Sequence, residues 1–511
     1  MFRTTLSAAL MSPVMASVGV AQTQCLHFVE HDSFPIDDFA FELVHADLNA
    51  DGHEDLLVGS QGPLQVEVLL GSGTGDFVGA PSVTAPGGAI GGLAVGDLSG
   101  DGIPDLVLAS SFPAPGFLQV SLGVGDGSFG PATYYSTRPE PGAVLLHDVD
   151  GNGALDIVTV NESSDGVSVL LGAGDGSFGP ARLFATRNGP REVAVIELNG
   201  DAAPDLAVTN FYSDNISILV GVGDGTFVTS AYVVEPGTQA LAVGDVTSDA
   251  IDDLVTTRYS ASGYRLYSYA GLGNGTFGPE QASPDVSGMP SKPLVLYDVD
   301  GDGLLDAVGA RDDRTTVRRG SGDGLFGSLE VIEGGYDQRA IAIDDFDEDG
   351  RPDFAVLSRA PDEVRILLQR PTGAESYCNT SPNSAGVGAL ITATGSFRVA
   401  DDDLQLSVSA LPPHEPGLFF CGDLEDDVPF EGGTLCVGGT HGLFRILPAL
   451  DSGAAGVATL DLELFAPPFD QPWSAVLPGS SWSFQYWYRD AAATPGSRVN
   501  LSDAVSVSFC P

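Results

Sequence analysis

A nine-residue acidic pattern recurs seven times in this 511-residue chain, and successive copies start 47 to 53 residues apart. The first copy reads DLNADGHED from Asp47, and short runs rich in valine, leucine and isoleucine flank every copy. A constant period of about 50 residues, with a turn in each unit, is typical of repeat proteins. The chain should therefore fold as a series of similar units. We number the acidic loops 1 to 7; they start at Asp47, Asp97, Asp148, Glu197, Asp245, Asp298 and Asp345.

Each unit is predicted to contain four β-strands, and none shows helical periodicity. An apolar strand follows each loop, as at 55–58, and a second strand leads to a glycine turn such as GVGDGSF at Gly123. A third strand and a Pro/Gly connector lead to the strand that enters the next loop. Four strands per unit are the layout of a β-propeller blade. A linear β-solenoid fits less well, because its units are usually shorter than about 50 residues.

The two ends of the repeat array complement each other. Seven loops are matched by only six glycine turns, because the seventh unit ends at 364–368 without one. In the complete turns the terminal phenylalanine precedes the next loop by 18 to 21 residues, and Phe28 lies 19 residues before Asp47. We therefore expect residues 26–33 to pair with the strand at 364–368, closing a seven-bladed ring without unpaired edges. This closure would bring Cys25 within reach of Cys378.

The spacing of the acids predicts a bound hard cation. In the pattern D-x-[DN]-x-D-G-x-x-D, the side chains at positions 1, 3, 5 and 9 and the carbonyl at position 7 can converge on one ion. Glycine at position 6 permits the left-handed backbone of a sharp turn. Oxygen ligands with several carboxylates select Ca²⁺ over Zn²⁺, copper or Mg²⁺. An EF-hand is excluded, because position 12 never carries the glutamate that it requires.

The candidate metal ligands are the residues at positions 1, 3, 5, 7 and 9 of each loop. They are Asp47, Asn49, Asp51, His53 and Asp55; Asp97, Ser99, Asp101, Ile103 and Asp105; Asp148, Asp150, Asn152, Ala154 and Asp156; Glu197, Asn199, Asp201, Ala203 and Asp205; Asp245, Thr247, Asp249, Ile251 and Asp253; Asp298, Asp300, Asp302, Leu304 and Asp306; and Asp345, Asp347, Asp349, Arg351 and Asp353.

The loops differ in how well they fit the pattern. Loops 6 and 7 carry four carboxylates each and the glycine, so they should bind calcium most tightly. Loops 1 and 3 should follow, with three acids, an amide and the glycine. Loop 2 has Ser99 in place of the amide. Loops 4 and 5 carry Ala202 and Ala250 in place of glycine, and Glu197 and Thr247 depart further, so these two sites are the doubtful ones.

These units resemble the FG-GAP/VCBS repeat family, whose propeller repeats also occur in integrin alpha chains. The resemblance is carried by the seven loops and covers about residues 25 to 370. It implies a β-propeller with calcium in the hairpin between the first two strands of a blade. Segments 435–439, 487–490 and 500–503 resemble a module found at the C-terminus of secreted bacterial repeat proteins.

The N-terminal segment predicts an exported protein, and the net charge excludes some classes of partner. The formal charge is −48, from 69 acids against 21 bases, which argues against nucleic acid or anionic membrane as partners. Residues 1–21 read as a signal peptide, with Arg3, an apolar stretch and a small-x-small cleavage pattern at Ala21. We expect a secreted, monomeric protein without membrane insertion, whose cysteines form disulfides in preference to metal sites. Because their number is five, one thiol is left free or intermolecular, and the sequence does not decide which one.

The cysteines and strand patterns also divide the chain. We expect a seven-bladed β-propeller at 22–370, a linker at 371–377 and a small β-sandwich at 378–511. In the last part, Trp482, Phe484, Tyr486 and Tyr488 alternate along one strand. Core packing is the favoured reading of this alternation, and a platform for stacking glycans is the alternative.

No catalytic constellation is evident in the sequence. Its histidines lack a recurring Ser or Cys partner, and no G-x-S-x-G, H-E-x-x-H or phosphate loop is present. We therefore predict a non-enzymatic binding or adhesion module for an extracellular protein or glycan, whose ligand-binding residues remain unknown. A lectin with sugar pockets between blades is one alternative. A carbohydrate-active enzyme such as a polysaccharide lyase is another.

Overall fold

The computed structural model describes residues 26–62, 64–85, 89–110, 116–234, 238–260, 263–283, 293–311, 314–333, 336–370, 373–378, 382–394, 397, 399, 402–430, 433–439, 442–469, 471, 475–477, 480–490 and 499–509. Within these residues the fold is all-β, with no α-helix and a 3₁₀ turn, η1, at Glu162–Ser164. The chain divides into two compact units: the repeat region, Phe28–Arg370, and a C-terminal unit that contains Pro371–Pro511. The predicted signal peptide lies outside the described residues.

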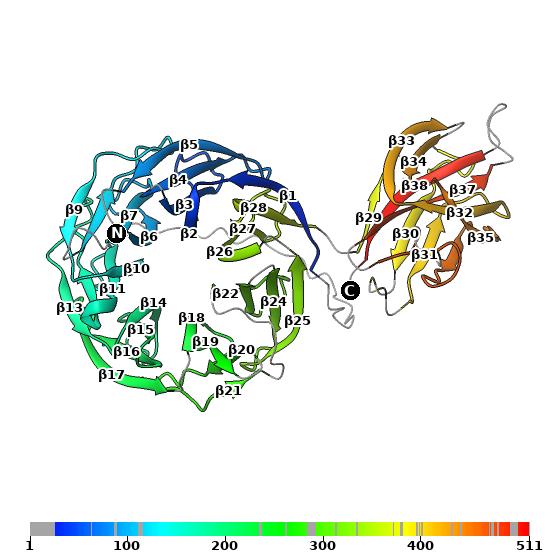
Figure 1. The fold of residues 1–511 in the computed structure, drawn as a ribbon. Coiled ribbons are helices and arrows are strands. Elements are labelled where there is room, and N and C mark those ends of the chain that lie inside the picture. Colours follow the sequence, from blue (N-terminus) through cyan, green and yellow to red (C-terminus); the bar gives the residue numbers. More distant parts are fainter. Residues whose placement is uncertain are drawn as a thin grey trace, which may run out of the picture. The chain divides into compact units, whose positions relative to one another are not determined.

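The described residues of the repeat region form seven four-stranded antiparallel sheets set around a ring (Figure 1). Sheets one to three are β2 (Asp38–Ala46), β3 (Asp55–Gly62), β4 (Leu64–Gly71) and β5 (Phe77–Thr84); β6 (Ile90–Gly96), β7 (Asp105–Ser110), β8 (Phe117–Ser121) and β9 (Thr133–Ser136); and β10 (Pro141–His147), β11 (Asp156–Asn161), β12 (Gly166–Leu170) and β13 (Arg182–Ala185). Sheets four to six are β14 (Pro190–Ile196), β15 (Asp205–Asn210), β16 (Asn215–Gly221) and β17 (Phe227–Val234); β18 (Thr238–Gly244), β19 (Asp253–Ser260), β20 (Gly263–Tyr269) and β21 (Gln281–Ala282); and β22 (Leu294–Tyr297), β23 (Asp306–Arg311), β24 (Arg314–Gly320) and β25 (Phe326–Glu333). Sheet seven is β26 (Tyr336–Asp344), β27 (Asp353–Ala360), β28 (Asp362–Gln369) and β1 (Phe28–Pro35).

The second strand of a sheet is buried on both faces, which explains its continuous apolar sequence. Every residue of β7, β11 and β15 is buried. The cores lie between neighbouring sheets: one cluster, for example, joins Leu57 and Val66 of sheet one to Leu106 of sheet two. Each sheet therefore depends on both neighbours for the burial of its two faces.

The N-terminal strand completes the last sheet, as predicted. Strand β1 pairs antiparallel with β28, with Val29 opposite Leu368 and Phe34 opposite Val364. Phe28 stacks on Phe354, with ring centroids 4.3 Å apart. The prediction that the two ends of the array close it by strand exchange is confirmed.

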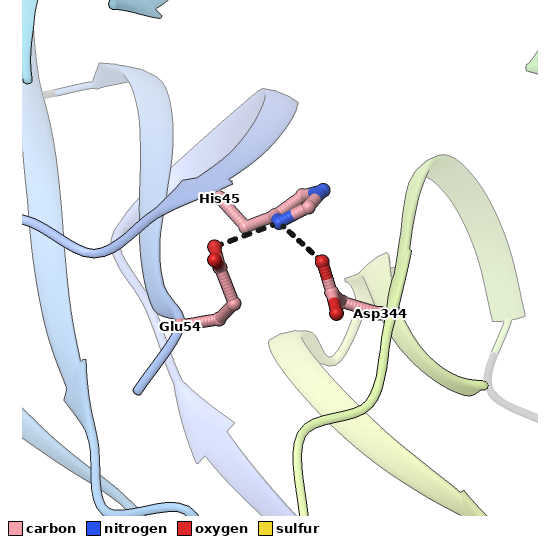
Figure 2. Close-up of side chains that lie close together, drawn as sticks. All are labelled: His45, Glu54 and Asp344. Atoms are coloured by element: carbon pink, nitrogen blue, oxygen red, sulfur yellow. Dashed lines mark hydrogen bonds and ion pairs between the residues drawn. The ribbon is translucent and has the colours of Figure 1, made fainter. Parts of the chain in front are cut away.

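Histidines also bridge the junction between sheet seven and sheet one, which we call the seam. His45 at the end of β2 lies between Glu54, just before β3, and Asp344, the last residue of β26 (Figure 2). His31 of β1 pairs with Asp76, next to β5, at 3.0 Å. The seam therefore combines strand pairing with contacts between charged side chains.

The part of the C-terminal unit that the structure describes contains three further sheets. The five-stranded sheet is β29 (Gly373–Tyr377), β38 (Val499–Ser508), β37 (Ser481–Arg489), β32 (Pro416–Gly422) and β35 (Phe444–Asp451). The three-stranded sheet is β30 (Leu390–Thr394), β31 (Gln405–Ser409) and β36 (Ala458–Asp461), and the hairpin is β33 (Leu424–Phe430) and β34 (Gly433–Gly438). One core cluster joins Leu406 of the three-stranded sheet to Phe484 of the five-stranded sheet. This shared core gives the layering of a β-sandwich.

The predicted linker at 371–377 is wrong for its last five residues. Gly373–Tyr377 form β29, which pairs antiparallel with β38 at the edge of the five-stranded sheet. Glycine, alanine and serine in this segment gave no apolar alternation. Its strand is specified by the backbone hydrogen-bonding groups of β38, which sequence pattern does not reveal.

The alternating aromatic residues of β37 are core residues, as predicted. Trp482, Phe484, Tyr486 and Tyr488 are at most 4% exposed. Trp487 points to a second cluster, with Phe420 and Cys436. These four aromatic rings are therefore not available as a platform for stacking sugars.

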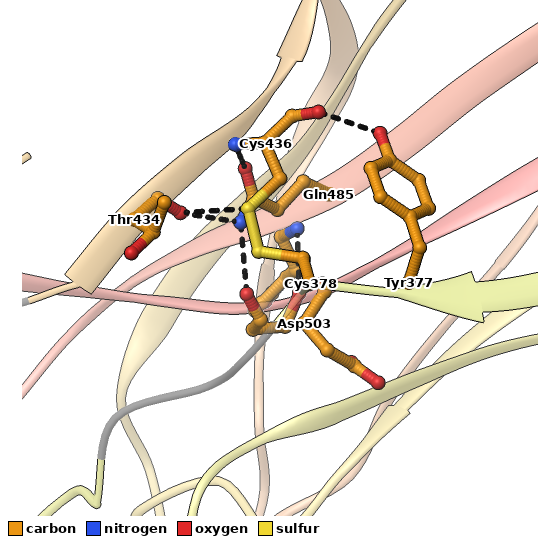
Figure 3. The surroundings of a disulfide bond; sticks show 8 residues. Tyr377, Cys378, Thr434, Cys436, Gln485 and Asp503 are labelled. Carbon is orange, nitrogen blue, oxygen red and sulfur yellow. Dashed lines mark hydrogen bonds between the residues drawn. A yellow bond between two sulfur atoms is a disulfide. The ribbon is translucent and has the colours of Figure 1, made fainter. Parts of the chain in front are cut away.

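A disulfide joins Cys378 to Cys436, with Cα atoms 6.2 Å apart (Figure 3). Tyr377 Oη donates a hydrogen bond to the Cys436 carbonyl at 2.6 Å. Gln485 Oε1 accepts from the Cys436 N–H at 3.1 Å. Cys378 is therefore bonded within its own unit. The suggested approach of Cys25 to Cys378 falls on a residue outside the described part of the chain.

Candidate metal centres

Each acidic loop connects the first and second strands of one sheet. Loop 1, for example, runs from the end of β2 into β3, and its position 9, Asp55, is the first residue of β3. All seven loops have this placement, which is the hairpin where the sequence resemblance expects calcium.

The loops share a backbone with two left-handed residues. Position 6 has φ between 84° and 90° where it is glycine, and Ala202 and Ala250 take the same conformation at 63° and 64°. Position 4 is also left-handed in every loop, even at Glu348, with φ 57°. The sequence pattern predicts only the first of these positions. Loops 4 and 5 thus keep the turn without glycine, at a cost of about 1–2 kcal/mol each.

The carboxylate at position 1 organises the turn. In six loops it accepts hydrogen bonds from the backbone N–H groups of positions 5 and 6, as Asp345 does at 2.9 and 2.8 Å. The side chain at position 5 in turn accepts from the N–H of position 7, as Asp349 does from Arg351 at 3.0 Å. In loop 4, the longer Glu197 accepts instead from Asn199 and Gly200. Loop 4 is therefore the one whose ligand geometry departs most.

The aspartate at position 9 is buried in all seven loops, and its two carboxylate oxygens connect the loop to the third strand. One oxygen accepts from the backbone N–H of position 2 at 2.9–3.3 Å. The other accepts at 2.7–2.9 Å from a backbone N–H at the end of the third strand. That donor is glycine in six sheets, since a Cβ there, as at Gly71, would lie 2.2 Å from the carbonyl oxygen of position 8. In the seventh sheet it is Gln369.

Burial raises the pKa of these position 9 carboxyls. The pKa of Asp55 rises to about 6, and those of Asp306 and Asp353 rise to about 7, because burial outweighs their backbone hydrogen bonds. Repulsion from the other loop carboxylates adds to the shift. A divalent cation would favour the ionised form and remove this conflict.

Three loops bring three carboxylates within 4.8 Å of one another among the described residues. They are loop 3 with Asp148, Asp150 and Asp156; loop 6 with Asp298, Asp300 and Asp302; and loop 7 with Asp345, Asp347 and Asp353. The other loops use an amide, a hydroxyl or a glutamate at one position. Three buried position 3 oxygens, Ser99 Oγ, Thr247 Oγ1 and Asp347 Oδ1, have no hydrogen-bond partner among the described residues. These oxygen-only donor sets fit Ca²⁺.

Arginines contact the most acidic loops. In loop 6, Asp300 forms an ion pair with Arg319, which also contacts Glu330 at 2.7 Å. In loop 7, Asp347 pairs with Arg370 at 2.7 Å. The fourth carboxylate of these loops is therefore partly neutralised by the protein itself, which reduces the advantage that the extra charge would give loops 6 and 7 in binding calcium.

Position 7 offers only its carbonyl as a candidate ligand, because its side chain is apolar in five loops and is paired with another residue in loops 1 and 7. The His53 imidazole pairs with Glu348 of loop 7, and the Arg351 guanidinium pairs with Asp349. His53 and Glu348 thus tie the first loop to the last across the seam. Within the described residues, no helix has the length and apolarity needed to span a bilayer.

Four stretches of the chain match the FG-GAP-like repeat: residues 47–108, 100–159, 148–208 and 298–356. Each match runs from one acidic loop to the strand after the next loop. Loop 5 lies outside all four, in agreement with its departures from the pattern. No curated protein matches the chain.

Several solved structures share a likeness at low identity. A lectin of Agrocybe aegerita that recognises non-reducing terminal N-acetylglucosamine is 21% identical, with 57% of this chain and 81% of the lectin covered and a TM-score of 0.43. BBS1N, solved in complex with ARL6DN, is 12% identical, with 68% and 98% covered and a TM-score of 0.47. A functionally unknown protein from Desulfotomaculum acetoxidans is 12% identical, with 58% and 90% covered and a TM-score of 0.42. At these TM-scores the likenesses carry no argument about what this chain binds.

Proposed function

This chain is an FG-GAP repeat protein, and we propose that its repeat region is a seven-bladed, calcium-stabilised β-propeller that serves as a non-enzymatic binding module for an extracellular protein or glycan. The observation that carries the proposal is the recurrence of one hydrogen-bonded loop at the same place in seven sheets. A loop repeated in this way, with oxygen donors converging and its position 9 carboxyl buried, suits a structural cation in each unit.

Calcium is the cation that the donors favour. Carboxylates, backbone carbonyls and an amide or hydroxyl supply oxygen ligands in adaptable number, whereas Mg²⁺ demands a stricter octahedron and Zn²⁺ prefers nitrogen or sulfur. The positions that would hold the ion are the side chains at 1, 3, 5 and 9 and the carbonyl at 7. When bound, Ca²⁺ would neutralise the clustered carboxylates and hold each hairpin in its turn.

The binding role rests on what the sequence contains and lacks. The turn and the cation account for the loop carboxylates. The sequence contains neither the G-x-S-x-G motif of a serine nucleophile nor the H-E-x-x-H motif of a metalloprotease. The predicted signal peptide and the disulfide of the C-terminal unit both suit an exported protein. Export, adhesion and a monomeric state are parts of this proposal.

Thermal unfolding with calcium, with a chelator, and after add-back of either Ca²⁺ or Mg²⁺ tests the metal. Each occupied site stabilises the fold by about 2.7 kcal/mol at a hundredfold excess of free ion over Kd. We expect the repeat region to melt far lower in chelator and to recover with Ca²⁺ alone. An unchanged melting temperature would refute calcium stabilisation.

One cavity favours the lectin alternative. It has a volume of about 390 Å³ and is lined by Tyr134 of β9, Arg138, Ser168 of β12 and Leu183 of β13. Tyr134 is 52% exposed. An exposed aromatic ring beside hydroxyl and guanidinium groups suits stacking on a sugar.

A glycan array separates these possibilities. If this cavity binds a sugar, Tyr134→Ala should abolish the array signal, whereas Tyr212→Ala, at an exposed tyrosine of another sheet, should keep it. Binding that survives Tyr134→Ala would place the glycan elsewhere. Release of unsaturated sugars absorbing in the ultraviolet would instead identify a polysaccharide lyase.

A further inference from the structure

We propose that His45, Glu54 and Asp344 form a second kind of metal site, for a divalent transition metal of the Zn²⁺ class, which cross-links the first and last sheets at the seam. None of the three residues belongs to the side chains predicted to hold calcium. Glu54 occupies position 8 of loop 1, and Asp344 precedes position 1 of loop 7.

The three donor atoms converge from separate segments of the chain (Figure 2). His45 Nδ1 lies 3.0 Å from Glu54 Oε2 and 3.3 Å from Asp344 Oδ2, and all three atoms lie within 4.8 Å of one another. Ligands bound to Zn²⁺ at about 2.0–2.1 Å in a tetrahedron are separated by about 3.3 Å. The observed separations therefore need only a small adjustment to surround such an ion.

The donor types select against calcium here. Calcium takes oxygen ligands, whereas imidazole nitrogen with two carboxylates is a donor set for zinc and neighbouring first-row metals. Two carboxylates and a neutral imidazole also balance the charge of one divalent ion. The acidic surroundings, which include Asp345 directly after Asp344, favour the approach of a cation.

A hydrogen-bonded cluster accounts less well for this geometry. A proton on the His45 Nδ1 makes one linear hydrogen bond, to Glu54 at 3.0 Å, whereas the Asp344 oxygen at 3.3 Å also faces this nitrogen. A metal ion would bind all three groups at once. His45 is held in place for this role by strand β2 and by an edge-on contact with the Phe346 ring, at 6.1 Å between centroids.

The site also has an open side. His45 and Asp344 line a cavity of about 670 Å³, to which Tyr297 of β22 and Glu42 of β2 also contribute. This space admits the ion and leaves room for a water as fourth ligand, as in zinc sites with three protein ligands. Since His45 and Glu54 belong to sheet one and Asp344 to sheet seven, a bound ion would cross-link the two ends of the ring.

The test uses the full chain with its acidic loops already saturated with Ca²⁺. Isothermal titration with Zn²⁺, and visible absorption with Co²⁺ as a spectroscopic substitute, should report one tight site per chain and a low-coordinate Co²⁺ spectrum. His45→Ala should weaken Zn²⁺ binding at least about 100-fold, since loss of an outer-shell partner alone costs 10–100-fold. His147→Ala is the matched control, because His147 likewise ends the first strand of a sheet just before an acidic loop.

Two further measurements keep the result decisive. Glu54→Gln and Asp344→Asn preserve side-chain size, and each should also lose the tight site. A zinc-soaked crystal of the parent should show an anomalous peak between the three residues. Zinc binding that is unchanged in His45→Ala, absence of a tight site in calcium-saturated parent protein, or an anomalous peak elsewhere with none at His45 would each overturn the proposal.

Discussion

The repeat region and the C-terminal unit are both built from antiparallel strands, yet they are held together in different ways. The buried side chains of the repeat region fall into several small clusters, each shared by neighbouring sheets. The C-terminal unit has one large cluster that contains Trp482 and Tyr486, and a disulfide beside it. The first unit therefore depends on closure of the ring and on its loops, whereas the second depends on one dominant core and a covalent link.

Deletion of β1 should have the largest effect and should act on the repeat region alone. Without Phe28–Pro35, β28 becomes an unpaired edge and the stacking of Phe28 on Phe354 is lost. We expect a loss on the order of 5 kcal/mol, from buried aromatic surface and strand pairing together. Differential scanning calorimetry should show the repeat-region transition well below that of the parent. An unchanged transition would mean that closure contributes little.

Removal of the disulfide should act on the other unit. Cys378 and Cys436 are separated by 58 residues, so replacement of both by serine should lower the stability of the C-terminal unit by roughly 4 kcal/mol. The repeat-region transition should stay in place in the same scan. A shift of both transitions would show that the two units unfold together, which would break the comparison.

A buried carboxyl gives the C-terminal unit its own pH dependence. Burial raises the pKa of Asp503 from 3.8 to about 6, although its Oδ1 accepts the Ile391 N–H at 2.6 Å. The pKa of Asp503 is higher in the folded state than in the unfolded state. Its contribution to the stability of the unit is therefore complete below about pH 4 and is lost as the pH rises through about 6. Asp503→Asn should therefore gain on the order of 2 kcal/mol relative to the parent between pH 4 and pH 7. Denaturation curves measured across this pH range test the prediction. A stability difference between Asp503→Asn and the parent that does not change with pH would contradict the raised pKa of Asp503.

The smallest effect concerns Arg319 of β24, which contacts loop 6. Arg319→Ala removes the ion pair with Asp300 and should tighten calcium binding by loop 6 about tenfold, or about 1.4 kcal/mol. Arg339→Ala is the control, since Arg339 pairs with the exposed Asp337 outside the loops. In calcium titrations, Arg319→Ala should raise the affinity of loop 6 when it is the only substitution. The same substitution should have no effect on affinity in a protein that also carries Asp298→Ala, which disables the loop. A gain that persists in that background would mean that Arg319 acts elsewhere.

The fold of the repeat region was largely predictable, because the strand pattern of each unit corresponds to the sheet that the unit forms in the structure. The period, the four strands per unit and the closing strand at Phe28 all follow from features that recur, so each copy checks the others. The loop ligands were assigned by the same logic. The left-handed residue at position 4 was missed because alanine, serine and glutamate also occupy it, at Ala50, Ser248 and Glu348.

The C-terminal unit offered no such internal check. Its alternating aromatic strand was interpreted correctly as core, because large apolar side chains at every second position demand burial. Strand β29 was mistaken for a linker, because an edge strand of small residues is stabilised mainly by the backbone of its neighbour. The partner of Cys378 was likewise undetermined, since residues separated by 58 positions carry no local signal of their approach.

The sequence by itself determined that this chain folds as repeated four-stranded sheets with oxygen-rich loops, because strand periodicity and ligand spacing are properties of adjacent residues. Only the tertiary structure decided which charges meet across the fold. Arg319 beside Asp300, Arg370 beside Asp347 and His45 between Glu54 and Asp344 all depend on how strands and sheets pack together. Such contacts join residues 9 to 299 positions apart, and the distance between them is set by packing, which no local pattern encodes.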